Sequence, residues 1–362
     1  MRVLIEIGHP AHVHQFRHVI YELRRKGHEV CVATTDKEMT LALLNAYKLE
    51  YALLGVNKGG GVAYKSALLL KSFLKMLTVV KIFKPDIFVS RGSPVSAITS
   101  RLLNKPHISF YDTEHTSMQD AITVPLTDTI IVPSCYQKNH GQTQIAIDGY
   151  KELMYLHPAR FTPNPAVLTE LGLAEGDPFI IIRFVSWQAS HDVGYNGLTL
   201  DTKRKAVHEF EKYGRVFITS EKPLPEEFEK YRISVSPEKM HDLLYYATLL
   251  YGESATMASE CAVLGTHAIF CDFAGRGYTD EEERDYNLVY NFKLDESSQE
   301  NSIEKAVELL QDPALKTKGR EKQKRLLNDK IDVTAFMVWF IENYPQSVAI
   351  IKRNPYLQEQ FK

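Results

Sequence analysis

Short apolar runs alternate with amphipathic stretches along most of the chain, and this alternation constrains the fold more than any other feature. In the first half, RVLIEI (2–7) precedes the amphipathic stretch 12–27. In the second half, the strongly apolar FIIIRFV (179–185) precedes RVFITS (215–220). Strands this short and apolar, with helices between them, form a parallel sheet that helices cover on both faces. The sequence therefore predicts an α/β protein.

The length of the chain indicates more than one domain. One hydrophobic core rarely serves 362 residues. A proline-rich stretch that begins at Pro158 separates the two alternating halves and is typical of a linker. We expect a first domain at 1–157, a second domain at 158–334 and C-terminal helices at 335–362 that pack back on the first domain.

Charge and cysteine content exclude several classes of protein. The net charge of −2 argues against a dedicated nucleic-acid binder. The four cysteines are scattered without a CxxC pair, so a structural zinc site is not expected. No run of about 18 apolar residues is present, which argues against a transmembrane helix. The amino terminus reads as a strand rather than a signal peptide. We therefore expect a cytoplasmic protein with reduced thiols.

One predicted helix, at residues 65–84, leaves two interpretations open. Its lysines, Lys71, Lys75 and Lys81, lie on one face at helical spacing, and a separate apolar stripe lies on another. The first interpretation is a helix packed on the core with a solvated basic face. The second is a peripheral contact with an anionic membrane at its inner face.

Histidines gather at the turn after the first predicted strand, GHPAHVHQF (8–16). Ligands of open parallel sheets bind where strands end and helices begin. Histidine titrates near neutral pH, so it suits acid–base chemistry there. His12 is the first candidate and His14 the second, while the alternative is that they cap the helix. A metal site is not expected, because two histidines two positions apart on a helix diverge.

A second polar turn, YDTEHTSMQD (111–120), follows the fifth predicted strand of the first half. It contains Asp112, Glu114 and His115. A carboxylate beside a histidine can orient it and tune its pKa. These three residues are therefore candidate catalytic residues, and the alternative is a solvated loop.

In the second half, the stretch GESATMASECAVLG (252–265) joins a short strand to a helix. The free N–H groups of a helix start, together with the helix dipole, attract anions. Ser254, Ala255 and Thr256 are small enough to let a diphosphate approach the backbone. Glu260, one turn deeper on the same helix face, could accept hydrogen bonds from a ribose. The alternative is a capped helix whose glutamate is solvated.

Further candidate ligands follow neighbouring strands of the second half. Arg183 lies inside an apolar strand and needs a partner or ligand, because a buried unpaired charge is costly. A diphosphate would suit it, and Ser186 follows directly. Asp280 and Asn287 lie in an acidic stretch that could reach a ligand or be solvated surface.

Three stretches resemble the DUF354 family: DTEHTSMQDAITVPLTD (112–128), GYKELMYL (149–156) and IIRFVSWQASHD (181–192). The resemblance covers roughly residues 1–340. DUF354 is related to the GT-B superfamily. That superfamily includes the MurG-type N-acetylglucosaminyltransferases and the non-hydrolysing UDP-N-acetylglucosamine 2-epimerases.

The resemblance implies a GT-B-like fold of two Rossmann-like parallel-sheet domains that face a central cleft. It implies a sugar nucleotide on the second domain, with a UDP-sugar as the first expectation, and a glycan or lipid-linked acceptor on the first. The Ser-Gly-Gly turn of the superfamily resembles Ser254 to Thr256, followed by Glu260. PAHV (10–13) resembles a first turn that ends in histidine. The acid of the fifth-strand loop falls on or near Glu114.

The superfamily's polar motif near the donor sugar resembles residues 278–287. Such enzymes need no metal and no cofactor, because a helix start and an arginine neutralise the diphosphate. Three functions stay open: a glycosyltransferase with His12 as general base and Glu114 assisting, a sugar-nucleotide 2-epimerase, and a non-catalytic sugar-nucleotide-binding protein.

Overall fold

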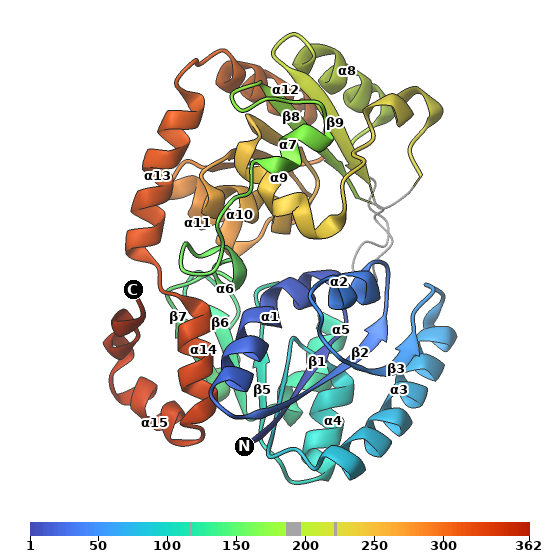
Figure 1. Ribbon diagram of the computed structural model, residues 1–362, viewed down its shortest axis with the longest axis vertical. Coiled ribbons are helices and arrows are strands. Elements are labelled where there is room, and N and C mark those ends of the chain that lie inside the picture. The colour runs from blue at the N-terminus through green and yellow to red at the C-terminus, as the bar shows by residue number, and fades with distance from the viewer. Residues whose placement is uncertain (116, 186–196, 221–222) are drawn as a thin grey trace. The chain divides into compact units, whose positions relative to one another are not determined.

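The computed structural model describes residues 1–115, 117–185, 197–220 and 223–362 (Figure 1). The chain forms two units. The first comprises residues 1–160 together with 330–362, and the second comprises residues 161–329. Each unit contains its own parallel sheet with helices on it, so the α/β prediction is confirmed.

The first unit contains a seven-stranded parallel sheet with the strand order β3-β2-β1-β4-β5-β6-β7. Because β1 and β4 are neighbours, the order reverses between them, and ligands of open α/β sheets bind at such a point. Its strands are β1 (Arg2–Ile7), β2 (Glu29–Asp36), β3 (Ala52–Val56), β4 (Ile87–Ser90), β5 (His107–Phe110), β6 (Thr129–Pro133) and β7 (Gln144–Ile147). Its helices are α1 (Pro10–Arg25), α2 (Thr40–Ala46), α3 (Val62–Phe83), α4 (Pro94–Leu102), α5 (Ser117–Thr123), α6 (Leu153–Leu156), α14 (Val333–Glu342) and α15 (Gln346–Arg353).

The second unit contains a five-stranded parallel sheet with the strand order β12-β11-β10-β8-β9, in which β10 is central. Its strands are β8 (Phe179–Phe184), β9 (Arg215–Ser220), β10 (Leu249–Gly252), β11 (His267–Cys271) and β12 (Val289–Phe292). Its helices are α7 (Ala166–Glu170), α8 (Leu200–Phe210), α9 (Met240–Tyr246), α10 (Ala255–Leu264), α11 (Gly277–Arg284), α12 (Glu296–Leu310) and α13 (Leu315–Asp329).

The C-terminal segment belongs to the first unit, where α14 packs against α1. Asp332 caps α14 by accepting the N–H of Ala335 at 3.0 Å. The guanidinium of Arg160 donates to Asp332 at 2.8 Å and to Glu22 of α1 at 2.7 Å. These ion pairs tie the returning chain to the first helix of the unit.

None of the helices in the described ranges is both long and apolar enough to span a membrane.

Candidate functional site

Each sheet has an edge at which its strands end, called here the carboxyl edge, and the sequence candidates cluster at these two edges. In the first unit the turn from β1 to α1 contains His9 and His12. His9 is the N-cap of α1, and its Nδ1 accepts the N–H of Ala11 at 3.2 Å. The N–H of Gly8 donates to Nδ1 of His12 at 3.3 Å. A neutral His12 ring in this bond therefore carries its proton on Nε2.

The His12 imidazole is neutral at physiological pH. Desolvation lowers the pKa of His12 well below 6.5, and the positive charge of Arg91 lowers it further. A neutral histidine at a helix start, with Nδ1 bonded to a backbone N–H, acts as a hydrogen-bond donor through Nε2. For a glycosyltransferase, the sequence suggested His12 as the general base. The bond from Gly8 opposes that role, because a base needs an unprotonated Nε2.

His14, the second candidate in this turn, lies in the packing between helices. It is 8% exposed, its Nδ1 lies 3.1 Å from the hydroxyl of Tyr47, and its ring contacts that of Tyr155. His12 and His14 are two positions apart on α1 and so lie on different faces of the helix. His12 faces the sheet edge, and His14 faces α2 and α6. The structure therefore does not support His14 as a catalytic residue.

Asp112 lies at the end of β5 inside a buried network of charges. Its carboxylate is 2.7 Å from Nζ of Lys151 and also accepts from Arg91. Lys151 in turn lies 2.5 Å from Glu152, and both side chains are almost fully buried. Burial alone would raise the pKa of Asp112, but Arg91 and Lys151 together hold it well below its usual range. Asp112 therefore stays ionised and cannot act as a proton donor near neutral pH.

The other two candidates of this turn differ in exposure. Glu114 is 6% exposed, and its carboxylate accepts the N–H of Gln137 at 3.4 Å. His115 is exposed. Glu114 thus belongs to the polar cluster at the carboxyl edge, whereas His115 faces solvent.

Three residues of this edge were not predicted from the sequence: Glu6, Arg91 and Lys151. Glu6 accepts hydrogen bonds from Ser93 at 2.6 Å and Ser96 at 2.5 Å, which joins β1 to the start of α4 at the point of strand reversal. Burial raises the pKa of Glu6 despite these two bonds. The sequence offered little signal for them, since, apart from the adjacent Lys151–Glu152 pair, their partners lie 21 to 90 positions away.

In the second unit the start of α10 lies at the end of the central strand. Ser254 is its N-cap, and the Ser254 hydroxyl accepts the N–H of Met257 at 3.3 Å. Ser254, Ala255 and Thr256 are partly exposed. Gly252 has a φ of +153°, and a Cβ there would lie 2.2 Å from the carbonyl oxygen of Arg183. The strand can therefore pass Arg183 this closely only with glycine at position 252.

Arg183 lies beside the end of β10, because it pairs in register with Gly252. It is partly exposed and donates to the hydroxyl of Thr219 on β9 at 3.1 Å. Arg183 and the start of α10 thus lie at the same carboxyl edge of the second sheet. Ser186, the remaining candidate from this strand, lies outside the described residues.

Glu260 has a protein partner in the structure. It is 5% exposed, and its Oε1 lies 3.0 Å from Nε2 of the equally buried His241 on α9. The sequence analysis expected a ribose at this carboxylate.

The two candidates of the acidic stretch lie at opposite edges of the sheet. Asp280 is in the first turn of α11, after β11 ends, and is partly exposed beside the Arg276–Asp272 ion pair of 2.8 Å. Asn287 follows α11 and immediately precedes β12, where it has a φ of +53°. This places Asn287 at the edge where strands begin. The structure therefore corrects its assignment as a nucleotide ligand.

Among the residues that the structure describes, no three side chains of His, Cys, Asp or Glu are grouped so as to hold a metal ion. The polar groups at both carboxyl edges are instead suited to binding anions and hydroxyl groups. Arg91 and neutral His12 provide donors in the first unit, and Arg183 with the start of α10 provides donors in the second.

The chain belongs to the family described as protein of unknown function (DUF354), whose model matches residues 1–342. A relative from Methanocaldococcus jannaschii, MJ0665, is 23% identical over 282 residues, which cover 74% of this chain and 81% of the relative. The resemblance inferred from the three sequence stretches is thus confirmed.

Solved structures share the fold of this chain, in which each of two domains contains a parallel sheet. The S. aureus MnaA–UDP co-structure matches with a TM-score of 0.69 and 11% identity, over 96% of this chain and 98% of that one. Spinosyn rhamnosyltransferase SpnG, complexed with spinosyn aglycone, matches with a TM-score of 0.61 and 15% identity, over 95% of this chain and 100% of that one. At such identities the likeness establishes the fold alone.

Proposed function

We propose that this DUF354 member is a glycosyltransferase that uses a nucleotide-diphosphate sugar, with UDP-sugars as the first donors to test. The observation that carries the proposal is the start of α10 beside Arg183 at the carboxyl edge of the central strand. Two solved structures of the same fold are complexes, one of MnaA with UDP and the other of SpnG with thymidine diphosphate. A diphosphate is the ligand whose charge and shape fit a helix start next to an arginine.

In this proposal the second unit holds the donor. The N–H groups at Ala255 and Thr256 and the Arg183 guanidinium bind the diphosphate, and the Ser254 hydroxyl donates to it. The partly exposed Asp280 accepts hydrogen bonds from hydroxyl groups of the sugar. Glu260, one turn into α10, accepts ribose hydroxyl groups. Positive charge aimed at the diphosphate stabilises it as it leaves, so the proposed mechanism requires no metal or cofactor.

The first unit is proposed to serve the acceptor. His12 donates its Nε2–H to an acceptor oxygen, and the carboxylate of Glu114 takes the proton of the attacking hydroxyl. The oxygen of the attacking hydroxyl forms a bond to the anomeric carbon of the donor sugar. The bond from this carbon to the diphosphate breaks, and a nucleoside diphosphate leaves. Asp112 positions Arg91 and Lys151 rather than transferring protons.

A sugar-nucleotide epimerase is the second candidate, because several carboxylates gather at the carboxyl edge of the first unit. The ion pairs of Asp112 with Arg91 and Lys151 disfavour it, since they remove one of its three proposed acid–base residues. Product analysis separates the two functions. An epimerase converts a UDP-sugar without acceptor, a glycosyltransferase releases UDP only when an acceptor is present, and a sugar-nucleotide sensor binds without turnover.

Substitutions at His12 distinguish a hydrogen-bond donor from a general base. We expect His12→Ala to lower kcat on the order of 100-fold, the usual effect of losing one preorganised donor. His12→Gln should recover most of this loss, because the glutamine amide can place an N–H near the position of Nε2. If kcat falls equally in both variants, and if the wild-type rate falls at the low pH at which His12 is protonated, His12 acts as a general base instead.

Arg183 offers a direct test of the donor site. Arg183→Ala should weaken binding of a UDP-sugar by roughly 10- to 100-fold in calorimetry, because a charge-assisted hydrogen bond is lost. Arg204→Ala is the matched control, since Arg204 is exposed on α8 and pairs with Asp201 and Glu227. Equal affinities in Arg183→Ala and wild type would remove Arg183 from the site.

A further inference from the structure

Exposed apolar side chains are concentrated on one part of the first unit. Of the fifteen large apolar residues exposed among the described ones, eight lie on β3, on α3 or at the end of α4. These elements are neighbours, because α3 packs against both β3 and α4 (Figure 1). The eight residues, called here the α3 surface, are Leu53, Val56, Tyr64, Leu70, Leu74, Ile82, Leu102 and Leu103.

The core does not account for the outer side of α3. Its inner side packs Met76 and Val80 into the hydrophobic core. On the outer side Leu70 is 60% exposed, Leu74 is 56% exposed and Ile82 is 78% exposed. Contiguous exposed apolar residues on a soluble unit mark a surface that binds something.

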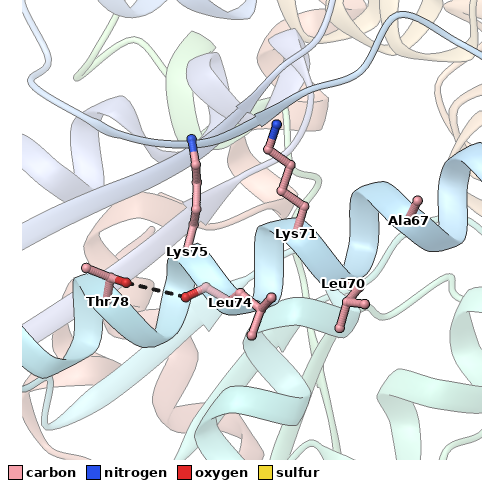
Figure 2. A pocket seen from close by; sticks show the side chains of 6 residues that line it. All are labelled: Ala67, Leu70, Lys71, Leu74, Lys75 and Thr78. Atoms are coloured by element: carbon pink, nitrogen blue, oxygen red, sulfur yellow. Dashed lines mark hydrogen bonds between the residues drawn. The ribbon is translucent and has the colours of Figure 1, made fainter.

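Figure 2 shows the middle of this surface as a hollow along the helix. Leu70 and Leu74 project from one side of α3, and Lys71 and Lys75 project from the other. Ala67 and Thr78 complete the lining. The helix therefore presents apolar groups with ammonium groups beside them.

The charged residues in and around the α3 surface are almost all basic. Residues 51–111 contain nine lysines and arginines but only one acid, Asp86, in a chain whose net charge is −2. Asp86 is occupied, since it accepts the backbone N–H of Arg2 at 2.7 Å. On α3 itself Lys71, Lys75 and Lys81 are exposed, and the helix contains no acid. A partner of this surface must therefore be anionic as well as apolar.

We propose that the α3 surface docks on a lipid bilayer that contains anionic headgroups. Such a bilayer offers an apolar layer a few ångströms below a layer of phosphates. Leu70, Leu74 and Ile82 enter the first layer, and flexible lysine stems place their ammonium groups in the second. A nucleic acid would match the charge but not the exposed leucines. The helix lies on the bilayer and does not cross it.

Vesicle sedimentation tests this proposal with wild-type protein and no sugar nucleotide, so its outcome is independent of the proposed function. We expect binding to phosphatidylcholine vesicles that contain phosphatidylglycerol, little binding to phosphatidylcholine alone, and weaker binding at 0.5 M salt because salt screens exposed charges. Absence of binding to the anionic vesicles at low salt would overturn the proposal.

Two sets of substitutions assign the binding to α3. Lys71→Gln, Lys75→Gln and Lys81→Gln together should lower partitioning about 100-fold, at the strength usual for lysines near an anionic bilayer. The matched control removes three exposed lysines of the second unit, Lys205, Lys212 and Lys318, and should leave partitioning unchanged.

The apolar contribution has its own test. Leu70→Gln with Leu74→Gln should lower partitioning on the order of 10-fold or more while all lysines remain. Equal loss in the control lysine variant, or no loss in the leucine variant, would show that net charge alone drives binding. Concentration-dependent dimers that these substitutions abolish would show that the surface binds a second copy, which would also overturn the proposal.

Discussion

Lys151→Met should lower the free energy of unfolding by about 3–5 kcal/mol, as expected when one partner of a buried ion pair is removed. The Lys151 side chain is 2% exposed and lies between Asp112 and Glu152, at 2.7 and 2.5 Å. Without its ammonium group, Glu152 loses this buried cation and Asp112 loses one of the two cations that pair with it. Urea denaturation at pH 7.5 measures the loss.

A matched substitution controls for the change of side chain. Lys138→Met removes a lysine that is 38% exposed and pairs with Asp120, and an exposed pair contributes at most about 1 kcal/mol. Adding Glu152→Gln to Lys151→Met should recover part of the stability, because the buried carboxylate that lost its Lys151 partner is also removed. A loss below about 1 kcal/mol in Lys151→Met would show that the network is not a stabilising element.

Two buried histidines that stay neutral in the folded protein should together lower stability by about 4 kcal/mol between pH 7.5 and pH 5. Burial lowers the pKa of His107 to about 3, and burial together with the charge of Lys322 lowers that of His267 to about 3. The unfolded chain binds these protons below its usual pKa of 6.5. Stability is therefore complete above pH 6.5 and is lost as the pH falls toward 3.

The contribution of His267 can be isolated. Its Nε2 lies 3.0 Å from Nζ of Lys322, and a glutamine side-chain oxygen can replace it as acceptor. His267→Gln should therefore reduce the difference in unfolding free energy between pH 7.5 and pH 5 by about 2 kcal/mol. His208→Gln, at a histidine side chain that is 75% exposed, is the control. An unchanged pH dependence in His267→Gln would contradict the assignment of a buried neutral imidazole.

The parallel-sheet fold was predictable because its central strands are buried on both faces. Such strands must be continuously apolar, as β1 and β8 are, and helices must separate them. Gly252 and Ser254 also showed where β10 ends and α10 begins. The strands β7 and β12 were not predicted, because four residues at a sheet edge have too short an apolar pattern to stand out from a loop.

Only those features of the candidate site that depend on a single strand–helix turn could be predicted from the sequence. The place of Ser254, Ala255 and Thr256 follows from the strand–helix boundary alone. The partners of Asp112 and Glu260 do not, since they come from other elements and are chosen by tertiary packing. His12 combines a feature that the sequence predicts with one that it does not. Its position could be read from the sequence, but the backbone bond that fixes its proton on Nε2 could not.

The central claim is that the start of α10 binds the diphosphate of a sugar nucleotide. Ala255→Asp tests it, because a carboxylate in the first helical turn repels a diphosphate while it stabilises the helix itself. Ala63→Asp places the same charge in the first turn of α3, in the other unit, and is the control. We would titrate wild type and both variants calorimetrically with UDP-N-acetylglucosamine and UDP. Binding by wild type and Ala63→Asp, lost in a folded Ala255→Asp, is the predicted result. Equal binding by all three proteins, or no binding of UDP or its sugar by wild type, would contradict the claim.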